Sequence, residues 1–104
     1  VVICATGVGI CISANKVKGV RAGMGYTDDV ARLMRVHNDA NVIAFGQDFM
    51  SYEDVEKRVD IFLTTEFAGS YHCTRIQQIK DIENNKAISQ TPIINKNNKH
   101  TKGQ

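Results

Sequence analysis

The chain opens with Val1-Val2-Ile3-Cys4-Ala5-Thr6-Gly7-Val8-Gly9, in which an apolar, β-branched run leads into a turn of small residues. An uninterrupted apolar run bounded by glycine is typical of a strand that is buried on both faces, as in parallel sheets. Such a strand lies between neighbouring strands, so we expect further sequence upstream of Val1. The stretch therefore predicts the strand-to-helix junction of a parallel α/β protein.

Strand and helix patterns alternate after this junction. The expected order is strand 1–4, helix 10–17, strand 20–25, helix 28–36, strand 42–46, a helix after Ser51 and a helix over 72–86. Gly19 is placed as a helix-ending glycine, while Thr27 and Ser51 are good N-caps. This alternation predicts an α/β fold, a parallel sheet with helices on its faces.

The helix after Ser51 has a clear apolar pattern. Val55, Val59, Phe62 and Leu63 fall at i, i+4, i+7 and i+8, which places them on one helical face. We therefore expect all four side chains to face the core.

Length and composition restrict the class of protein. With 104 residues, 42% of them hydrophobic, the chain has material for one modest core, which we assign to residues 1–88. Residues 89–104 are polar, and we expect them to be a disordered tail. Apolar runs are far shorter than a membrane helix requires, and the start does not resemble a signal peptide. Transmembrane, secreted disulfide-rich and repeat proteins are therefore excluded, and no membrane partner is expected.

The net charge of +2 comes from the tail, which holds three lysines and no acidic residue. The other 88 residues carry ten basic and eleven acidic side chains. Nucleic-acid-binding domains concentrate lysine and arginine on one face, often with aromatic residues between them. Because the chain has no such pattern, we expect no nucleic-acid partner.

Three cysteines, Cys4, Cys11 and Cys73, form no C-x-x-C pair and have no spacing typical of a metal site. Free thiols are typical of a reducing compartment, so a cytoplasmic protein without a bound metal is expected.

In parallel α/β sheets, ligands bind outside the carboxyl ends of the strands. Those ends are predicted at residues 4–9, 25–27 and 46–49. A glycine-rich turn that opens a helix can direct backbone N–H groups at an anion. The dinucleotide fingerprint G-x-G-x-x-G fails because Ile12 stands at the third glycine position, and G-K-[ST] is absent. An anion-binding turn and a merely tight connection remain equally open.

Cys4 is the first candidate for chemistry, since a helix N-terminus nearby can lower the pKa of a thiol. The alternative is that Cys4 is a small buried hydrophobic residue, which is the more common role of a lone cysteine. Cys11 and Cys73 lie in helical contexts, and only this second interpretation is offered for them.

Two polar groups lie elsewhere. The cluster His37-Asn38-Asp39-Ala40-Asn41 sits between a helix and a strand. It could be a helix C-terminal cap, in which an asparagine takes left-handed geometry and His37 suits the negative helix end. His72 and Arg75 lie one turn apart and could bind a phosphate, or could be a solvated surface pair.

Taken together, these segments resemble one family. They are Val1-x-Ile3-Cys4-x-Thr6-Gly7-Val8-Gly9-Ile10, Ser13-Ala14-Asn15-Lys16-Val17, Gly19-Val20-Arg21-Ala22, His37-Asn38-Asp39-x-Asn41-Val42, then Glu66-Phe67 and Gly69 before His72. Their order and spacing, as far as about Ile82, resemble the type B ribose-5-phosphate isomerases, a family that includes galactose-6-phosphate isomerase.

The resemblance implies an aldose–ketose isomerase, most simply for ribose 5-phosphate, with a Rossmann-like sheet, a composite active site in a homodimer or larger homo-oligomer, and no cofactor. It implies that Cys4 moves the C2 proton and that Thr6 and the amides of Gly7, Val8 and Gly9 stabilise the enediolate. It also implies that His37 assists ring opening, Asn38 binds sugar hydroxyls, and Arg75 with His72 binds the phosphate. The free edge of the first strand independently favours association with another chain.

The chain departs from the family pattern in several places. Two strand–helix units that precede the cysteine in the family, with an Asp–His pair that contributes to the site, have no counterpart here. Ala5 replaces a glycine, while Asp48 and Tyr71 each replace an arginine. These departures favour altered phosphate binding and motivate the alternative of a non-catalytic relative that binds sugar phosphate or serves in assembly.

Overall fold

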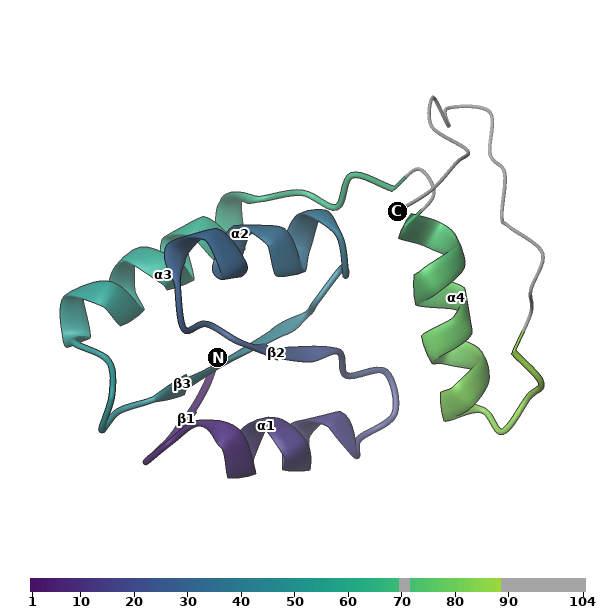
Figure 1. Cartoon of the computed structure of the whole chain (residues 1–104), viewed down its shortest axis with the longest axis horizontal. Coiled ribbons are helices and arrows are strands. Elements are labelled where there is room, and N and C mark those ends of the chain that lie inside the picture. Colours follow the sequence, from purple (N-terminus) through teal and green to yellow (C-terminus); the bar gives the residue numbers. More distant parts are fainter. Residues whose placement is uncertain (70–71, 89–104) are drawn as a thin grey trace. The chain divides into compact units, whose positions relative to one another are not determined.

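A computed structural model of the chain describes residues 1–69 and 72–88. Its elements are β1 (Val2–Cys4), α1 (Val8–Asn15), β2 (Ala22–Met24), α2 (Asp28–Val36), β3 (Val42–Gly46), α3 (Tyr52–Thr64) and α4 (His72–Glu83) (Figure 1). They fall into two compact units, one over Val1–Phe67 and one from Ala68 onward. The tail predicted to be disordered lies outside the described residues, and a single domain over 1–88 stays a prediction.

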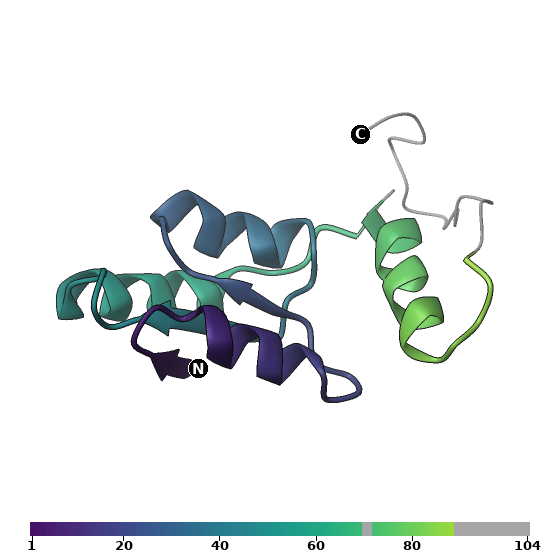
Figure 2. The same cartoon turned by 60° about the horizontal axis from the view of Figure 1, so that its bottom comes forward.

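The first unit is built on a parallel sheet with strand order β1-β3-β2. Cys4 is paired with Gly46 at one end of β3, and Ala22 with Val42 at the other. Helix α1 packs against one face of the sheet, while α2 and α3 pack on the other face and against each other (Figures 1 and 2). The predicted parallel α/β sheet with flanking helices is confirmed.

The core surrounds the central strand. Ile43, Ala44 and Phe45 are fully buried, because β3 has a strand on each side and a helix over each face. Ala31 and Met34 of α2 and Phe62 of α3 complete the buried cluster. An apolar strand without polar alternation is what this position in a parallel sheet requires.

Strand β1 lies at the edge of the sheet formed by the described residues. It pairs only with β3, and Ile3 is 49% exposed. Val2 and Cys4, on the opposite face, are half-buried, and α1 packs against this strand. Burial of β1 on both faces was predicted together with further sequence upstream of Val1, so it stays a prediction for the natural protein.

Helix α3 confirms most of the predicted apolar face. Ser51 caps the helix by accepting a hydrogen bond from the Asp54 N–H at 3.1 Å. Phe62 is buried, and Val55 and Val59 pack partly buried against the core, but Leu63 is 72% exposed. The expectation for Leu63 was wrong because it lies 100° around the helix from Phe62, one residue before the helix ends.

Helix α1 begins two residues earlier than predicted, because left-handed Gly7 (φ 86°) is its N-cap. Its last residue, Asn15, makes a reciprocal pair of hydrogen bonds with the backbone of Ala22. The Asn15 amide nitrogen donates to the Ala22 carbonyl at 3.0 Å, and the Asn15 oxygen accepts from the Ala22 N–H at 2.8 Å. The Asn15 side chain thereby satisfies both backbone hydrogen-bonding groups of Ala22, the first residue of β2.

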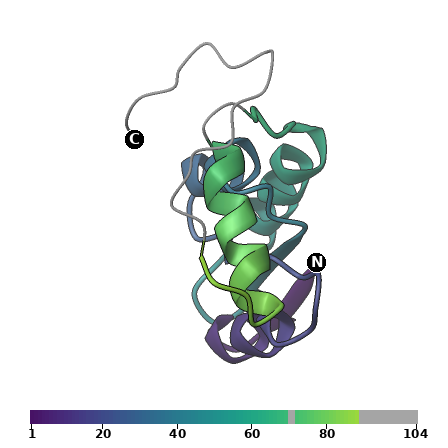
Figure 3. The same cartoon turned by 90° about the vertical axis from the view of Figure 1, so that its right-hand side faces the viewer.

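In the second unit, α4 is one unbroken helix (Figure 3). It ends at Glu83, before the predicted residue 86, because Asn85 takes a left-handed conformation (φ 58°). The Lys86 N–H bonds the Asp81 carbonyl at 2.8 Å and the Asn85 N–H bonds the Ile82 carbonyl at 3.1 Å. These two bonds form a Schellman motif, which terminates the helix.

Thr27 is expected to contribute measurably to stability as the N-cap of α2. Its hydroxyl accepts from the Val30 N–H at 3.0 Å, so Thr27→Ala leaves that donor without its cap. We expect the free energy of unfolding to fall by about 1 kcal/mol in urea denaturation. Ser13→Ala, at an exposed position within α1, is the control. An equal loss in both variants would contradict the capping role.

Candidate functional site

The carboxyl ends of β1 and β3 lie side by side at one end of the sheet. The Gln47 N–H donates to the Cys4 carbonyl and the Asp48 N–H to the Ala5 carbonyl, both at 2.9 Å. These bonds hold the turn after β3 against the turn after β1. The predicted ligand-binding segments at residues 4–9 and 46–49 are therefore adjacent.

Two glycines allow this close approach. A Cβ on Gly7 would come within 2.9 Å of the Gly46 nitrogen and the Phe45 carbonyl carbon. A Cβ on Gly46 would overlap the carbonyl of Thr6. Ala5, by contrast, is not among the described non-glycine residues with positive φ, so replacing the family's glycine there does not strain the turn.

The Cys4 thiol lies under the turn and is half-buried. The Gly7 N–H donates to its sulfur at 3.2 Å. The backbone N–H of Ile10 lowers the pKa of Cys4 most, burial opposes it, and the N–H groups of Gly7, Thr6 and Gly9 lower the pKa further. A cluster of N–H donors stabilises a thiolate more than a thiol, so the turn favours the ionised form.

Thr6 is exposed beside this thiol. Its oxygen accepts a hydrogen bond from the Val8 N–H at 3.2 Å. Because a hydroxyl that accepts can still donate, the Thr6 proton can be directed at a ligand oxygen.

Cys11 shows the opposite behaviour. Its thiol lies 3.6 Å from the Ala22 carbonyl, and burial raises its pKa. This agrees with the expectation that Cys11 is a small apolar residue.

Alkylation should separate the two thiols, since only thiolate reacts. We expect the rate of Cys4 modification by iodoacetamide to rise with a midpoint below the ordinary value of 9.0, and that of Cys11 above it. Peptide mass spectrometry over a pH series measures both rates in one sample. Equal midpoints would contradict a thiolate stabilised by the turn.

His37 and Asn38 lie at the opposite end of the strands, before β3 begins. They follow α2 and precede β3, whereas Cys4 is paired with Gly46 at the far end of that strand. Four residue steps of a strand span about 13 Å. The fold therefore does not bring His37 and Cys4 together within one chain.

The end of α2 is a C-terminal cap in part as expected. His37 is the C-cap residue of α2, and its N–H donates to the Leu33 carbonyl at 2.8 Å. Both His37 and Asn38 are exposed. The left-handed residue, however, is Asp39 (φ 48°) and not an asparagine.

His72 and Arg75 lie on α4, in the second unit, and Tyr71 lies outside the described residues. The Arg75 guanidinium donates to the Gln78 side chain at 3.1 Å.

Within residues 1–69 and 72–88, no three potential ligands are grouped to hold a metal ion. No helix of that part of the chain has the length and apolarity to cross a membrane.

Comparison with known proteins identifies the family. The sequence model of a family described as "Ribose/Galactose Isomerase" matches residues 1–79. The chain belongs to the ribose/galactose isomerase family. It is 43% identical over 83 residues to the putative sugar phosphate isomerase YwlF of Bacillus subtilis, and 42% identical over 83 residues to ribose-5-phosphate isomerase B of Escherichia coli. Each match covers 80% of this chain and 56% of the relative, so the chain spans little more than half of these family members.

Solved structures of family members share the fold. Ribose-5-phosphate isomerase B of Clostridium thermocellum superimposes with a TM-score of 0.78 at 42% identity, covering 81% of this chain and 57% of that one. The Mycoplasma genitalium enzyme, solved with bound ribulose 5-phosphate, gives a TM-score of 0.77 at 42% identity, covering 80% and 55%.

Sequence reasoning placed Gly46 and Asp39 near the site but did not predict what either residue does. Gly46 was predicted at a ligand-binding strand end, and its role in close backbone approach was not, although a glycine closing an apolar strand is a sign of such an approach. Asp39 was placed in the polar cluster after the helix, but its partner Arg21 lies 18 residues away in sequence.

Proposed function

We propose that the natural protein containing this chain interconverts a phosphorylated aldose and ketose, with ribose 5-phosphate and ribulose 5-phosphate as the pair. The observation that carries the proposal is the Cys4 thiol beneath backbone N–H donors that lower its pKa, in a chain of this family. The ribulose 5-phosphate bound to the Mycoplasma genitalium relative supports the choice of sugar.

In the proposed reaction the Cys4 thiolate removes the proton on C2 of the open-chain aldose. The electron pair of the C2–H bond forms a C1–C2 double bond, and the carbonyl oxygen on C1 becomes an enediolate oxygen. The thiol then gives its proton to C1, and the C2 hydroxyl proton passes to the C1 oxygen, so C1 becomes an alcohol carbon and the carbonyl moves to C2. The reaction has no net redox change, and a base with pKa near ambient pH suits it.

The charge that develops on oxygen needs preorganised donors. We assign this role to the Thr6 hydroxyl and to the amides of Gly7, Val8 and Gly9. The Gly7 N–H bonds the sulfur and the Val8 N–H bonds Thr6, so these two donors also hold the base and the hydroxyl in place.

Within this proposal His37 assists ring opening and Asn38 binds sugar hydroxyls. Because the length of β3, about 13 Å, separates their end of the sheet from Cys4, we assign them to the site of a second chain in a homodimer or larger homo-oligomer. Two-fold symmetry would then form two equivalent composite sites.

The phosphate requires cationic partners. The Asp48 carboxylate follows Gln47 at the Cys4 edge and is exposed, so an anion beside it is disfavoured. We therefore assign the phosphate to Arg75 and His72 on α4, which supply a guanidinium and an imidazole one turn apart.

The first test is an isomerase assay on the natural protein. We expect ribulose 5-phosphate to form from ribose 5-phosphate, and allose 6-phosphate and galactose 6-phosphate complete the panel. Folded protein that binds these sugar phosphates saturably without turnover would overturn the proposal in favour of a non-catalytic relative.

Complementation tests the composite site. Cys4→Ala and His37→Ala are each expected to be nearly inactive, while a mixture refolded together should regain about a quarter of the wild-type activity. Half of the randomly formed dimers are mixed, and each holds one intact site. No recovery in mixtures shown to contain mixed dimers would place both residues in one chain's site and contradict the assignment.

A further inference from the structure

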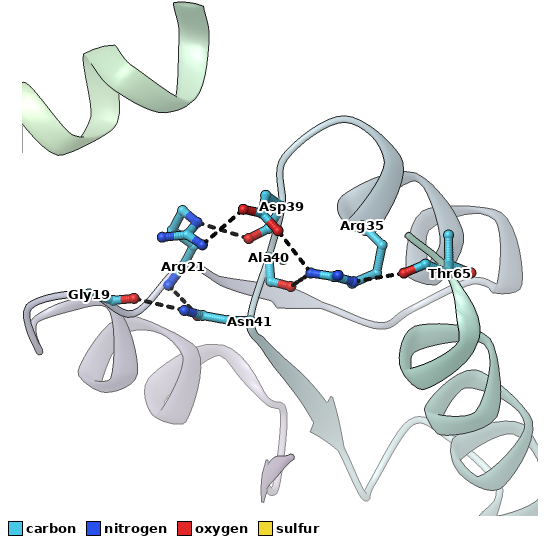
Figure 4. Close-up of polar contacts among 7 residues, drawn as sticks. All are labelled: Gly19, Arg21, Arg35, Asp39, Ala40, Asn41 and Thr65. Carbon is cyan, nitrogen blue, oxygen red and sulfur yellow. Dashed lines mark hydrogen bonds and ion pairs between the residues drawn. The ribbon is translucent and has the colours of Figure 1, made fainter. Parts of the chain in front are cut away.

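The segment directly after His37 and Asn38 is held by a network of charged and polar groups (Figure 4). Asp39 is its centre, directly after the two candidate site residues, in a left-handed conformation (φ 48°). Glycine accepts such a conformation freely, and asparagine and aspartate accept it as single residues. What distinguishes Asp39 is the set of contacts that its carboxylate makes.

Both oxygens of the Asp39 carboxylate are occupied by arginines from different elements. Oδ2 lies 3.3 Å from Arg21, which precedes β2, and Oδ1 lies 3.2 Å from Arg35 in the last turn of α2. Arg21 Nε also donates to the Asp39 backbone carbonyl at 2.8 Å. The residue is thus held by side chain and main chain together.

The two arginines are themselves fixed. Arg35 donates to the Ala40 carbonyl at 2.6 Å and to the Thr65 carbonyl at 3.0 Å, and its guanidinium lies 5.6 Å from the centre of the Phe62 ring. Their side chains are 22% exposed for Arg35 and 20% for Arg21, so water screens these contacts less than at an open surface.

Asn41 closes the other side of the loop. Its side-chain oxygen accepts from the Arg21 N–H at 2.8 Å, and its amide nitrogen donates to the Gly19 carbonyl at 2.8 Å. The loop from Asp39 to Asn41 is therefore tied to the start of β2 and, through Arg35, to the end of α3.

We propose that Asp39 is a positioning residue, which with Arg21 and Arg35 holds His37 and Asn38 in the geometry required by the sugar. This inference rests on the proposed isomerase function. His37 and Asn38 are exposed and directly precede Asp39, so the contacts that fix Asp39 restrict the backbone that carries them. A site residue held by rigid contacts loses less freedom when substrate binds, and a displacement of about 1 Å costs on the order of 100-fold in rate.

The test is a double-mutant cycle between Asp39→Gly and His37→Ala. Glycine accepts the left-handed backbone while removing the carboxylate, so the loop conformation remains possible. We expect Asp39→Gly to lower kcat/KM roughly 10- to 100-fold in the wild-type protein and by a clearly smaller factor when His37 is already alanine, because only the placement of Asn38 is then left to lose. Asp39→Asn, which keeps one acceptor oxygen, should lie between wild type and Asp39→Gly.

Asp54→Asn is the matched control. It removes a carboxylate that pairs with Arg58 at 3.7 Å on α3, outside this loop. We expect its kcat/KM to be unchanged. All assays are run well below the melting temperature of each variant, so that loss of folded protein does not enter.

The outcomes are distinct. Equal losses from Asp39→Gly in both backgrounds, or no loss in either, overturn the positioning role while leaving the isomerase intact. Absence of Cys4-dependent turnover in the wild-type protein overturns the proposed function and this inference with it.

Discussion

Replacing Cys4 by alanine is expected to lower kcat/KM for sugar-phosphate isomerisation by roughly 10²- to 10⁴-fold, the range that a positioned general base contributes. The thiolate is held by the Gly7 N–H at 3.2 Å, and the Ile10 N–H is the largest cause of its lowered pKa. Removing the sulfur removes the base but leaves the backbone donors in place. Steady-state kinetics on the natural protein measures the loss.

Cys4→Ser extends this test. The serine hydroxyl can occupy a similar position, but it does not ionise near neutral pH, so we expect a loss as large as that of Cys4→Ala. Cys11→Ala is the matched control, because burial raises the pKa of that thiol and it lies outside the turn. A Cys4→Ser variant with near wild-type activity would contradict proton transfer by the thiolate.

The same thiol determines the expected pH dependence. A thiol acts as a base only when ionised, so kcat/KM should fall as the pH drops through the pKa of Cys4. Because that pKa is lowered, the acid limb should have its midpoint below the ordinary value of 9.0.

Gly7→Ala is expected to have the largest effect on stability. The backbone at Gly7 is left-handed (φ 86°), and a Cβ would lie 2.8 Å from Met24 Cε and 2.9 Å from the Gly46 nitrogen. The strained conformation and the overlap with backbone atoms together should lower the free energy of unfolding by about 3 kcal/mol. Urea denaturation followed by circular dichroism measures this change.

Gly19→Ala separates the two contributions to that loss. Gly19 has nearly the same conformation (φ 85°), but a Cβ there would meet nothing within 4 Å. We expect Gly19→Ala to cost only about 1 kcal/mol, from backbone strain alone. If the two variants were equally destabilised, close packing between the turns after β1 and β3 would not be the cause.

Local features of the fold were predictable where short-range chemistry decides them. Thr27 and Ser51 cap their helices as expected, and the bounds of α2 and β3 agree with the prediction, because caps, turns and apolar runs act over a few residues. The motifs around Cys4 and His37 likewise sufficed for the family, which the match over residues 1–79 confirms.

Which side chains are buried, and which turns contact each other, depended on contacts between segments that are distant in sequence. An apolar pattern predicted burial for Leu63, yet this residue is 72% exposed, because the end of α3 determines what covers it. No local signal in the sequence places Gly46 against Thr6, since the two turns meet only through pairing of β1 with β3.

The candidate site also has one part that local sequence determines and another that depends on contacts between distant segments. The turn that lowers the pKa of Cys4 consists of residues within six positions of it, so its chemistry follows from consecutive sequence. Arg35 pairs with Asp39 four residues along the chain, but the separation of His37 from Cys4 and the contact of Arg21 with Asp39 arise only when β3 pairs with β1 and with β2. Parallel strands bring residues together by their position along the strand and by strand order, and neither is encoded in any single stretch of the chain.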